Sequence, residues 1–361
     1  MADIDCHSEM TNFHRDNVTL SNTQQGEMRT CRDAGRTRLE NGLNEAKKPQ
    51  PKEVRSQGSY QMRTMVQDDA NDYDIDDGAY FASDDLKDDA GAALTPKAAR
   101  QRVCDALVWD GRLKQEAAVK RNCVRQVYAA GYHIDIPVYR IVTTKDENDD
   151  PVEHYELASG DEWTRSDARA VTRWFNGLVG ELNAGESDGS QMRRVTKLTK
   201  KFARRAGWKN ETTSGICITK LVVDHFQDSV DRDDKALRET WKAIDKKLQK
   251  STEIDHPVLA TKLAQAGDAA VTFFRTCLSG ALKTLEVLDT SDCTRKKARE
   301  AWDDVFDTDF FSKQPDNKDD GGGGGGDNSG NGGNGGGGKG SAMSVTSVET
   351  ARRNDGGGRF G

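Results

Sequence analysis

Two acidic residues separated by one position, Asp74 and Asp76, are the most informative chemical feature of this chain. They lie in the segment DYDIDDGAYF, residues 72–81, which has the pattern of a β-strand. Because alternate side chains of a strand share a face, the two carboxylates should project together with Cβ atoms roughly 6 to 7 Å apart. Two such carboxylates can hold a pair of divalent cations.

A Gly58-Ser59 step precedes this strand, and a third acidic residue, Asp135, follows it. A turn that opens into a helix presents free backbone N–H groups to phosphate oxygens, so we expect a short helix over residues 60–67. Asp135 lies between isoleucines in GYHIDIPVYRI, residues 131–141, a β-branched run typical of a buried strand. A buried charge is costly unless it is paired or bound to metal, which makes Asp135 the natural third ligand.

Three carboxylates and a phosphate-binding turn indicate nucleotidyl transfer. Mg²⁺ prefers a few carboxylates together with substrate phosphates, and two ions about 3.5 to 4 Å apart activate an attacking hydroxyl and stabilise the departing pyrophosphate. An Asp-x-Asp pair alone is weak support, because Asp231 and Asp233, and likewise Asp307 and Asp309, have the same spacing. We interpret those two pairs as solvated faces and Asp77 as a surface position outside the metal site.

Several blocks of this sequence resemble the bacterial cGAS/DncV-like nucleotidyltransferases (CD-NTases), most closely the DncV branch. The blocks span about residues 56–226 in the expected order, and they are QGSYQM, DIDDGAY, HIDIPVY, GDEWTRSDARAVTRWF, QMRRVTKLTKKF and TSGICITKLVV. The resemblance implies an α+β fold with a polymerase-β-like palm and a mainly α-helical second lobe. It maps the family's metal-binding and catalytic acids onto Asp74, Asp76 and Asp135.

The resemblance also implies the activity. We expect synthesis of a cyclic oligonucleotide second messenger from ATP and GTP or other nucleoside triphosphates in anti-phage signalling, with Mg²⁺ or Mn²⁺ as cofactor, and 3′,3′-cyclic GMP-AMP as the product. Lys200 aligns with a lysine that contacts the triphosphate, with Lys201 as the alternative register, and Ser214 is a second candidate phosphate contact. Gly58 and Ser59 would bind the same triphosphate, and a cyclic-nucleotide-activated effector is the implied downstream partner.

Length and composition define the organisation. The 361 residues suggest a polar N-terminal segment over 1–50 with a long bracing helix and loosely attached first residues, a palm over 51–160, a helical lobe over 161–315 and a flexible glycine-rich tail over 316–361. A helix should follow the Thr95-Pro96 signal, and the strand around Asp135 should form a hairpin with the strand before it.

Charge and cysteine usage exclude some classes. A net charge of −7 argues against tight, sequence-independent nucleic-acid binding. Seven scattered cysteines indicate neither a disulfide framework nor a zinc site. The polar N-terminus and the lack of a long apolar run predict a cytoplasmic protein without a membrane segment.

The basic segment and the aromatic residues admit more than one interpretation. Lys197, Lys200 and Arg204 share a helix face that either meets a triphosphate or is simply solvated. Tyr80 and Tyr132 are candidates for contact with a base.

The tail ends in GGGRFG, and the resemblance suggests that a ubiquitin-conjugation-like enzyme acts on the Gly361 carboxylate, the alternative being a passive linker. Two other functions stay open: template-independent nucleotide addition to RNA, and a catalytically silent nucleotide-binding module.

Overall fold

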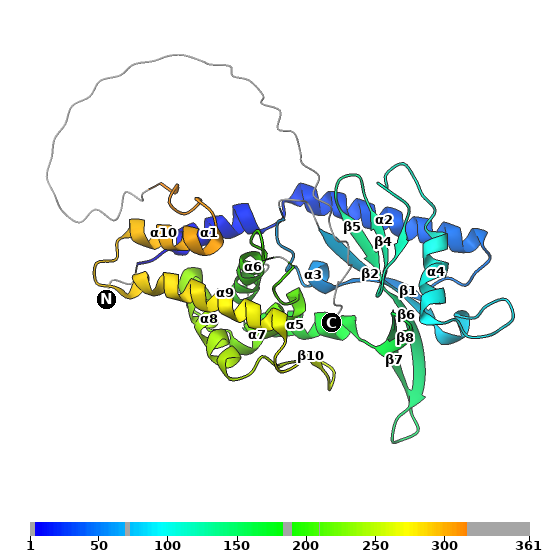
Figure 1. Ribbon diagram of the computed structural model, residues 1–361. Coiled ribbons are helices and arrows are strands. Elements are labelled where there is room, and N and C mark those ends of the chain that lie inside the picture. The colour runs from blue at the N-terminus through cyan, green and yellow to red at the C-terminus, as the bar shows by residue number, and fades with distance from the viewer. Residues whose placement is uncertain (1–3, 69–72, 183–189, 209, 316–361) are drawn as a thin grey trace, which may run out of the picture.

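The computed structural model describes residues 4–68, 73–182, 190–208 and 210–315. A mixed sheet with helices α2 and α4 against it forms one part of the molecule, and helices α5 to α10 form the other (Figure 1). The expected α+β fold with a mainly helical second half is confirmed. The predicted glycine-rich tail and Gly361 lie outside the described residues.

The helices are, in chain order, α1 (His7–Phe13), α2 (Asn22–Glu45), α3 (Gly58–Gln61), α4 (Pro96–Ala106), α5 (Ala168–Leu182), α6 (Gln191–Ala203), α7 (Gly215–His225), α8 (Asp233–Lys250), α9 (Ala269–Thr284) and α10 (Arg295–Phe306). The strands are β1 (Glu53–Gln57), β2 (Asp74–Ala82), β3 (Ala118–Val119), β4 (Val124–Val127), β5 (His133–Ile136), β6 (Val138–Lys145), β7 (Pro151–Ser159), β8 (Glu162–Arg165), β9 (Ile254–Asp255) and β10 (Lys262–Ala264).

Strand β2 is the centre of the main sheet. It pairs antiparallel with β1, and parallel with both β5 and β6. Strands β5 and β6 continue one another in the same register along β2, and Pro137, which has no N–H to donate, separates them. The expected hairpin is present, because β4 pairs antiparallel with β5 from Val127↔His133 to Val124↔Ile136.

Alternation along β2 and β5 gives the sheet an apolar and a polar face. Ile75 and Ile134 point toward α2 and α4 and join a buried core with Met28, Leu39 and Val103. The aspartates of the same strands point to the opposite face. Helices α2 and α4 thus cover the apolar face of the sheet, and the polar face with the aspartates is turned toward the second half of the chain.

Helix α2 is the long helix expected in the N-terminal segment, and it runs along the sheet (Figure 1). Ser21 caps it by accepting a hydrogen bond from the Gln24 backbone, while the Gln24 side chain accepts from the Ser21 N–H. Gly42 lets it approach α4 closely, because a Cβ there would lie only 2.0 Å from the Ala106 carbonyl oxygen. Helix α4 itself begins at the predicted Thr95-Pro96 signal.

The second half has its own aromatic core, and the N-terminal residues belong to it. Met10 and Phe13 of α1 are buried there, and the Phe13 ring lies 4.8 Å from that of Phe306. Glu9 is buried and pairs with Arg299 of α10. The expectation of loosely attached first residues is therefore wrong for the part of residues 1–15 that the structure describes.

Three other expectations need correction. The helix predicted over 60–67 is confined to α3, because Arg63 adopts a positive φ of 56° and the Thr64 N–H donates back to the Ser59 carbonyl. Asp77 is only 2% exposed and pairs with Arg36 of α2. Asp233, interpreted as solvated, is fully buried and pairs with an arginine of α6. Apolar periodicity alone could not predict these partners.

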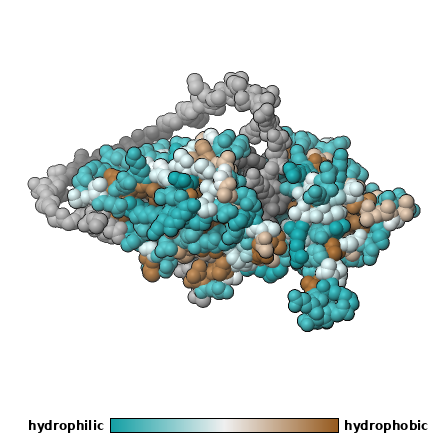
Figure 2. All heavy atoms as spheres, turned by 60° about the horizontal axis from the view of Figure 1, so that its bottom comes forward, coloured by the Kyte–Doolittle hydropathy of each residue, from teal (hydrophilic) through white to brown (hydrophobic). Residues whose placement is uncertain are grey.

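The face of the molecule shown in Figure 2 is mostly hydrophilic, with apolar side chains in small separate groups. Exposed large apolar side chains such as Trp109 and Val230 are few among the described residues. Within these residues no helix combines the length and apolarity needed to cross a bilayer.

Candidate active site

Three aspartates converge on the polar face of the sheet. Asp74 and Asp76 share that face of β2, and the parallel register places Asp135 directly opposite Asp76. One carboxylate oxygen from each residue lies within 4.8 Å of the others, the one such cluster of potential metal ligands among the described residues. A sheet register therefore brings together residues that are about sixty positions apart in the sequence.

The electrostatics of this cluster favour a bound cation. Burial, and then the neighbouring Asp74 and Asp135 carboxylates, raise the pKa of Asp76 well above its usual value. Asp76 Oδ1 is buried, and no hydrogen-bond donor among the described residues reaches it. Oxygen ligands with unneutralised charge suit a hard divalent ion, so the residues present fit Mg²⁺ or Mn²⁺.

Asp135 is the most enclosed of the three, with 1% of its surface exposed. Arg125 of β4 donates two hydrogen bonds to it, Nε to Oδ1 and Nη2 to Oδ2, each at 2.7 Å. This bidentate contact fixes the plane of the carboxylate. Arg125 was not a candidate in the sequence, although its cross-strand position opposite Asp135 follows from the hairpin that the sequence did predict.

Gly58 and Ser59 follow β1 immediately beside the aspartates. Gln57 pairs with Asp76 across β1 and β2, and Gly58 then turns with a φ of 63°. A Cβ at Gly58 would lie 2.4 Å from Asp76 Oδ2, so the turn touches the metal-ligand cluster and leaves room only for glycine. Ser59, half-buried, is the second residue of the short α3, which begins at Gly58.

Gln57, the residue before the turn, anchors the end of β1 in a buried hydrogen-bond network. Its side chain is 1% exposed, accepts a hydrogen bond from the Tyr80 hydroxyl and donates one to the Tyr139 hydroxyl, both at 2.9 Å. The two tyrosine rings are stacked at 4.5 Å. Tyr80 is therefore committed to this buried network, and the prediction that it contacts a base is not supported by its position.

Lys200 reaches the same region from α6. It is 6% exposed, and its Nζ donates to Thr64 Oγ1 at 2.9 Å, in the loop that follows α3. Burial, and then the Arg204 charge, lower the pKa of Lys200 to about 7. Because Thr64 is bonded to Ser59, Lys200 is linked to the Gly58-Ser59 turn.

The neighbouring lysines are also engaged with protein groups. Lys197 is 7% exposed and donates to Thr19 Oγ1 at 2.6 Å, and Lys201 donates to the Gln67 carbonyl at 3.3 Å. Of the predicted stripe only Arg204 is exposed. The interpretation as a solvated basic face is therefore wrong for Lys197 and Lys200.

Ser214 is the N-cap of α7, and the first residue of that helix lies beside Lys200. Its hydroxyl accepts a hydrogen bond from the Cys217 N–H, and a Cβ on the next residue, Gly215, would lie 3.8 Å from Lys200 Nζ. The adjacent Thr213 hydroxyl is buried and has no hydrogen-bond partner among the described residues. The start of α7 thus adds polar groups next to the lysine.

Two predicted positions lie elsewhere. The Tyr132 hydroxyl donates to Glu27 of α2, on the helix-covered side of the sheet, which is not where a base at the aspartates would lie. Gly361 lies outside the described residues.

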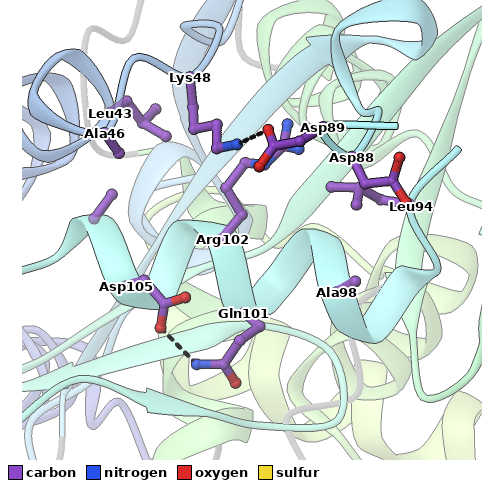
Figure 3. A pocket seen from close by; sticks show the side chains of 11 residues that line it. Leu43, Ala46, Lys48, Asp88, Asp89, Leu94, Ala98, Gln101, Arg102 and Asp105 are labelled. Atoms are coloured by element: carbon purple, nitrogen blue, oxygen red, sulfur yellow. Dashed lines mark hydrogen bonds and ion pairs between the residues drawn. The ribbon is translucent and has the colours of Figure 1, made fainter. Parts of the chain in front are cut away.

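A separate cavity of about 370 Å³ lies between the end of α2, α4 and the loop before it (Figure 3). Its polar walls are already paired: Lys48 with Asp89, and Gln101 with Asp105, while Arg102 donates to backbone carbonyl groups. Since α2 and α4 cover the face of the sheet opposite the aspartates, this cavity is not part of the candidate site.

Comparison with known proteins identifies the domain and the fold. Residues 52–139 match the family model described as cyclic GMP-AMP synthase DncV-like, nucleotidyltransferase domain. The fold is shared with Escherichia coli DncV in its 3′-deoxy GTP bound form, at 18% identity and a TM-score of 0.61 over 80% of this chain and 92% of that chain.

Two further structures share the fold. A mutant of the Vibrio cholerae di-nucleotide cyclase DncV, in complex with ATP, GTP and 5MTHFGLU2, is 16% identical with a TM-score of 0.66, over 84% of this chain and 96% of that chain. CdnC of E. coli MS115-1 with ATP is 15% identical with a TM-score of 0.61, over 85% and 99%. Residues 52–139 thus match a DncV-like nucleotidyltransferase domain, which confirms the resemblance of the three blocks within that range, and the solved structures show that the chain as a whole shares the fold.

Proposed function

We propose that this chain is a metal-dependent synthase that joins nucleoside triphosphates into a cyclic oligonucleotide and releases pyrophosphate at each step. The observation that carries the proposal is the convergence of Asp74, Asp76 and Asp135 beside the Gly58-Ser59 turn, within a DncV-like nucleotidyltransferase domain. A carboxylate cluster alone would suit many metal sites. The adjoining glycine turn and Lys200 support a nucleoside triphosphate as the ligand of this one.

The three carboxylates divide two tasks in this proposal. Asp74 and Asp76 hold the cations, and Asp135 holds one of them while orienting the attacking ribose hydroxyl. When bound, Mg²⁺ or Mn²⁺ would lower the pKa of that hydroxyl and neutralise the leaving pyrophosphate. Asp135 suits its task because it is enclosed and its plane is fixed by Arg125.

The donor triphosphate would lie between the Gly58-Ser59 turn, Lys200 and Ser214. Lys200 would exchange its hydrogen bond with Thr64 for a charge-assisted bond to a phosphate oxygen. Burial of the Lys200 ammonium group costs free energy. A bond to a negatively charged phosphate would recover more of that cost than the bond to the neutral Thr64 hydroxyl does. The turn and the Ser214 hydroxyl would supply further donors to the same phosphates.

The finer expectations rest on the relatives. ATP and GTP are named with the Vibrio cholerae enzyme, and related structures are described as cyclic AMP-GMP synthase, which supports these two nucleotides as substrates and 3′,3′-cyclic GMP-AMP as the product. A role in anti-phage signalling, a cyclic-nucleotide-activated effector and a cytoplasmic location are part of the same proposal.

Attachment of Gly361 to a partner stays a separate hypothesis, motivated by the terminal GGGRFG sequence. The test is mass spectrometry of the native protein expressed with a candidate ubiquitin-conjugation-like enzyme. An adduct through Gly361 is expected, and its consistent absence would leave the tail as a linker.

One incubation tests the main proposal. The protein is incubated with all four ribonucleoside triphosphates and Mg²⁺ or Mn²⁺, with and without an RNA acceptor, and the products are separated and weighed by mass spectrometry. A phosphatase-resistant cyclic product is expected, and Asp135→Asn should remove it. Products that appear only as extended RNA would replace the proposal with template-independent addition, and no consumption under any condition would favour a silent module.

A further inference from the structure

Arg125 and Asp135 form an ion pair that spans two strands of the sheet. They are directly opposite one another in the antiparallel β4–β5 register, which puts both side chains on the face that carries Asp74 and Asp76. The guanidinium makes both of its hydrogen bonds to the carboxylate at 2.7 Å, and the arginine side chain is 18% exposed. A single arginine therefore contacts the most enclosed member of the metal-ligand cluster.

This pair leaves the carboxylate able to bind a cation as well. An ionised carboxylate offers about four lone-pair positions, and a bidentate guanidinium occupies about two of them. One oxygen of this carboxylate lies within 4.8 Å of one oxygen each of Asp74 and Asp76, close enough for the three to share a cation. The arginine thus fixes the direction in which the remaining lone-pair positions point, and it places a positive charge next to the cation site.

The fixed carboxylate plane and the positive charge of Arg125 have different consequences, the first for turnover and the second for metal binding. A fixed carboxylate plane favours a productive arrangement of cation and acceptor hydroxyl. A positive charge beside the site opposes the cation but also offsets the mutual repulsion of three carboxylates. A pair that only joined β4 to β5 would affect stability and leave the turnover of a folded variant unchanged.

We propose that Arg125 is a positioning residue that orients Asp135 for the metal-dependent step and, by its charge, weakens the intrinsic affinity of the aspartate cluster for the divalent cation. The inference rests on the proposed function for its catalytic half. Its metal-binding half concerns the nucleotide-free protein and stands independently. Such an arrangement would keep the cluster from binding cations tightly until a nucleotide brings them.

Two substitutions separate charge from orientation. Arg125→Gln removes both the charge and the bidentate contact, whereas Arg125→Lys keeps the charge and loses the planar fork. Arg140→Gln is the matched control, because Arg140 of β6 also pairs across strands in the same sheet, with Glu156 of β7, away from the aspartates. Folding of every variant is checked by thermal unfolding.

The first readout is Mn²⁺ affinity of the nucleotide-free protein, measured by calorimetry or electron paramagnetic resonance. Arg125→Gln should bind Mn²⁺ about tenfold more tightly, the size that Coulomb's law gives for one charge about 6 Å from a divalent ion with water-like screening. Arg125→Lys and Arg140→Gln should stay within about threefold of the unchanged protein, since the first keeps the charge and the second lies elsewhere.

The second readout is cyclic product formation. Both Arg125 variants should lose about 10²-fold in turnover, the usual effect of misplacing a reacting group by about 1 Å. Arg140→Gln should keep turnover. Weaker or unchanged Mn²⁺ binding in Arg125→Gln would overturn the inference, and so would full turnover in Arg125→Lys.

These outcomes distinguish failure of the inference from failure of the proposed function. If no variant and no condition yields product, the proposed function fails while the Mn²⁺ measurement still decides the charge effect. If Arg125→Gln does not fold, Arg125→Lys tests the inference alone: its turnover should fall while its Mn²⁺ affinity stays unchanged. Loss of Mn²⁺ affinity in Arg125→Lys would then overturn the inference.

Discussion

Replacement of Gly58 by alanine should damage catalysis far more than it damages the fold. Gly58 has a φ of 63°, a left-handed conformation that costs an alanine about 1–2 kcal/mol. The added methyl would also lie 2.4 Å from Asp76 Oδ2 and 3.4 Å from Asp76 Cγ. Contact with a carboxylate oxygen at 2.4 Å is not tolerated, so either the turn or the carboxylate must move.

The size of that movement sets the expected loss of activity. An ordinary contact begins near 3.4 Å, so Gly58→Ala forces a displacement of about 1 Å in the turn or in Asp76, and a misplacement of that size costs about 10²-fold in rate. Initial rates of pyrophosphate release from ATP and GTP measure this loss. Urea unfolding should show a loss of about 1–3 kcal/mol, which leaves the protein folded.

Gly160→Ala provides the matched control. Gly160, in the turn between β7 and β8, has a similar φ of 56°, but a Cβ there would meet nothing closer than 3.7 Å. It should lose about 1–2 kcal/mol of stability through backbone strain and keep full turnover. Turnover of Gly58→Ala within threefold of the unchanged protein, or an equal loss in Gly160→Ala, would refute the assignment of the Gly58 turn to the site.

Four further predictions concern other parts of the site. The double variant Asp74→Asn with Asp76→Asn should abolish product, and in chelator it should raise the midpoint of thermal unfolding, because it removes repulsion between neighbouring carboxylates. A lowered midpoint would contradict this account. Since the pKa of Lys200 is about 7, the KM for nucleoside triphosphate should rise with pH above 7, and Lys200→Arg, which stays charged, should abolish that rise. In the unfolded state Lys200 keeps its proton up to its usual pKa near 10.5, whereas in the folded state it loses the proton near pH 7. The contribution of Lys200 to stability should therefore increase with pH between these two values. Urea unfolding of Lys200→Met and of the unchanged protein over this pH range measures that contribution. Gln57→Leu should cost about 2–4 kcal/mol in urea unfolding, because it removes the acceptor of the buried Tyr80 hydroxyl and a donor to the buried Tyr139 hydroxyl. Gln67→Leu, at a position that is only half-buried, should cost less.

The aspartate cluster was predictable because it depends on short-range rules. Alternation places Asp74 and Asp76 on one face, and the β-branched run around Asp135 indicated a buried strand. A shift of one residue in the β2–β5 register would turn Asp135 away from them, and the apolar residues between the aspartates oppose that shift because it would expose Ile134. The pattern that buries the isoleucines therefore also aligns the carboxylates.

The lysine environment was not predictable in the same way. Lys200 lies in a segment whose basic residues and helical spacing are equally typical of a solvated face. Its burial depends on a contact with Thr64, which is 136 positions away in the sequence. Thr64 lies in the loop after α3, a helix that ends earlier than the sequence predicted. The pairing of Glu9 with Arg299 has the same character, with a separation of 290 residues, and no local pattern indicates it.

The two halves of the site hold opposite and incompletely balanced charges. On the sheet, burial and like charge raise the pKa of Asp76, while on α6, burial lowers the pKa of Lys200 even though the negative Asp74 opposes that shift. The ionised form of Asp76 and that of Lys200 are therefore each disfavoured by their surroundings. A divalent cation would relieve the carboxylates and a phosphate would relieve the lysine. A nucleoside triphosphate carried with its metal ion supplies both charges in one ligand, which is the physical reason that this pair of environments, and not the aspartates alone, favours a nucleotidyl-transfer site.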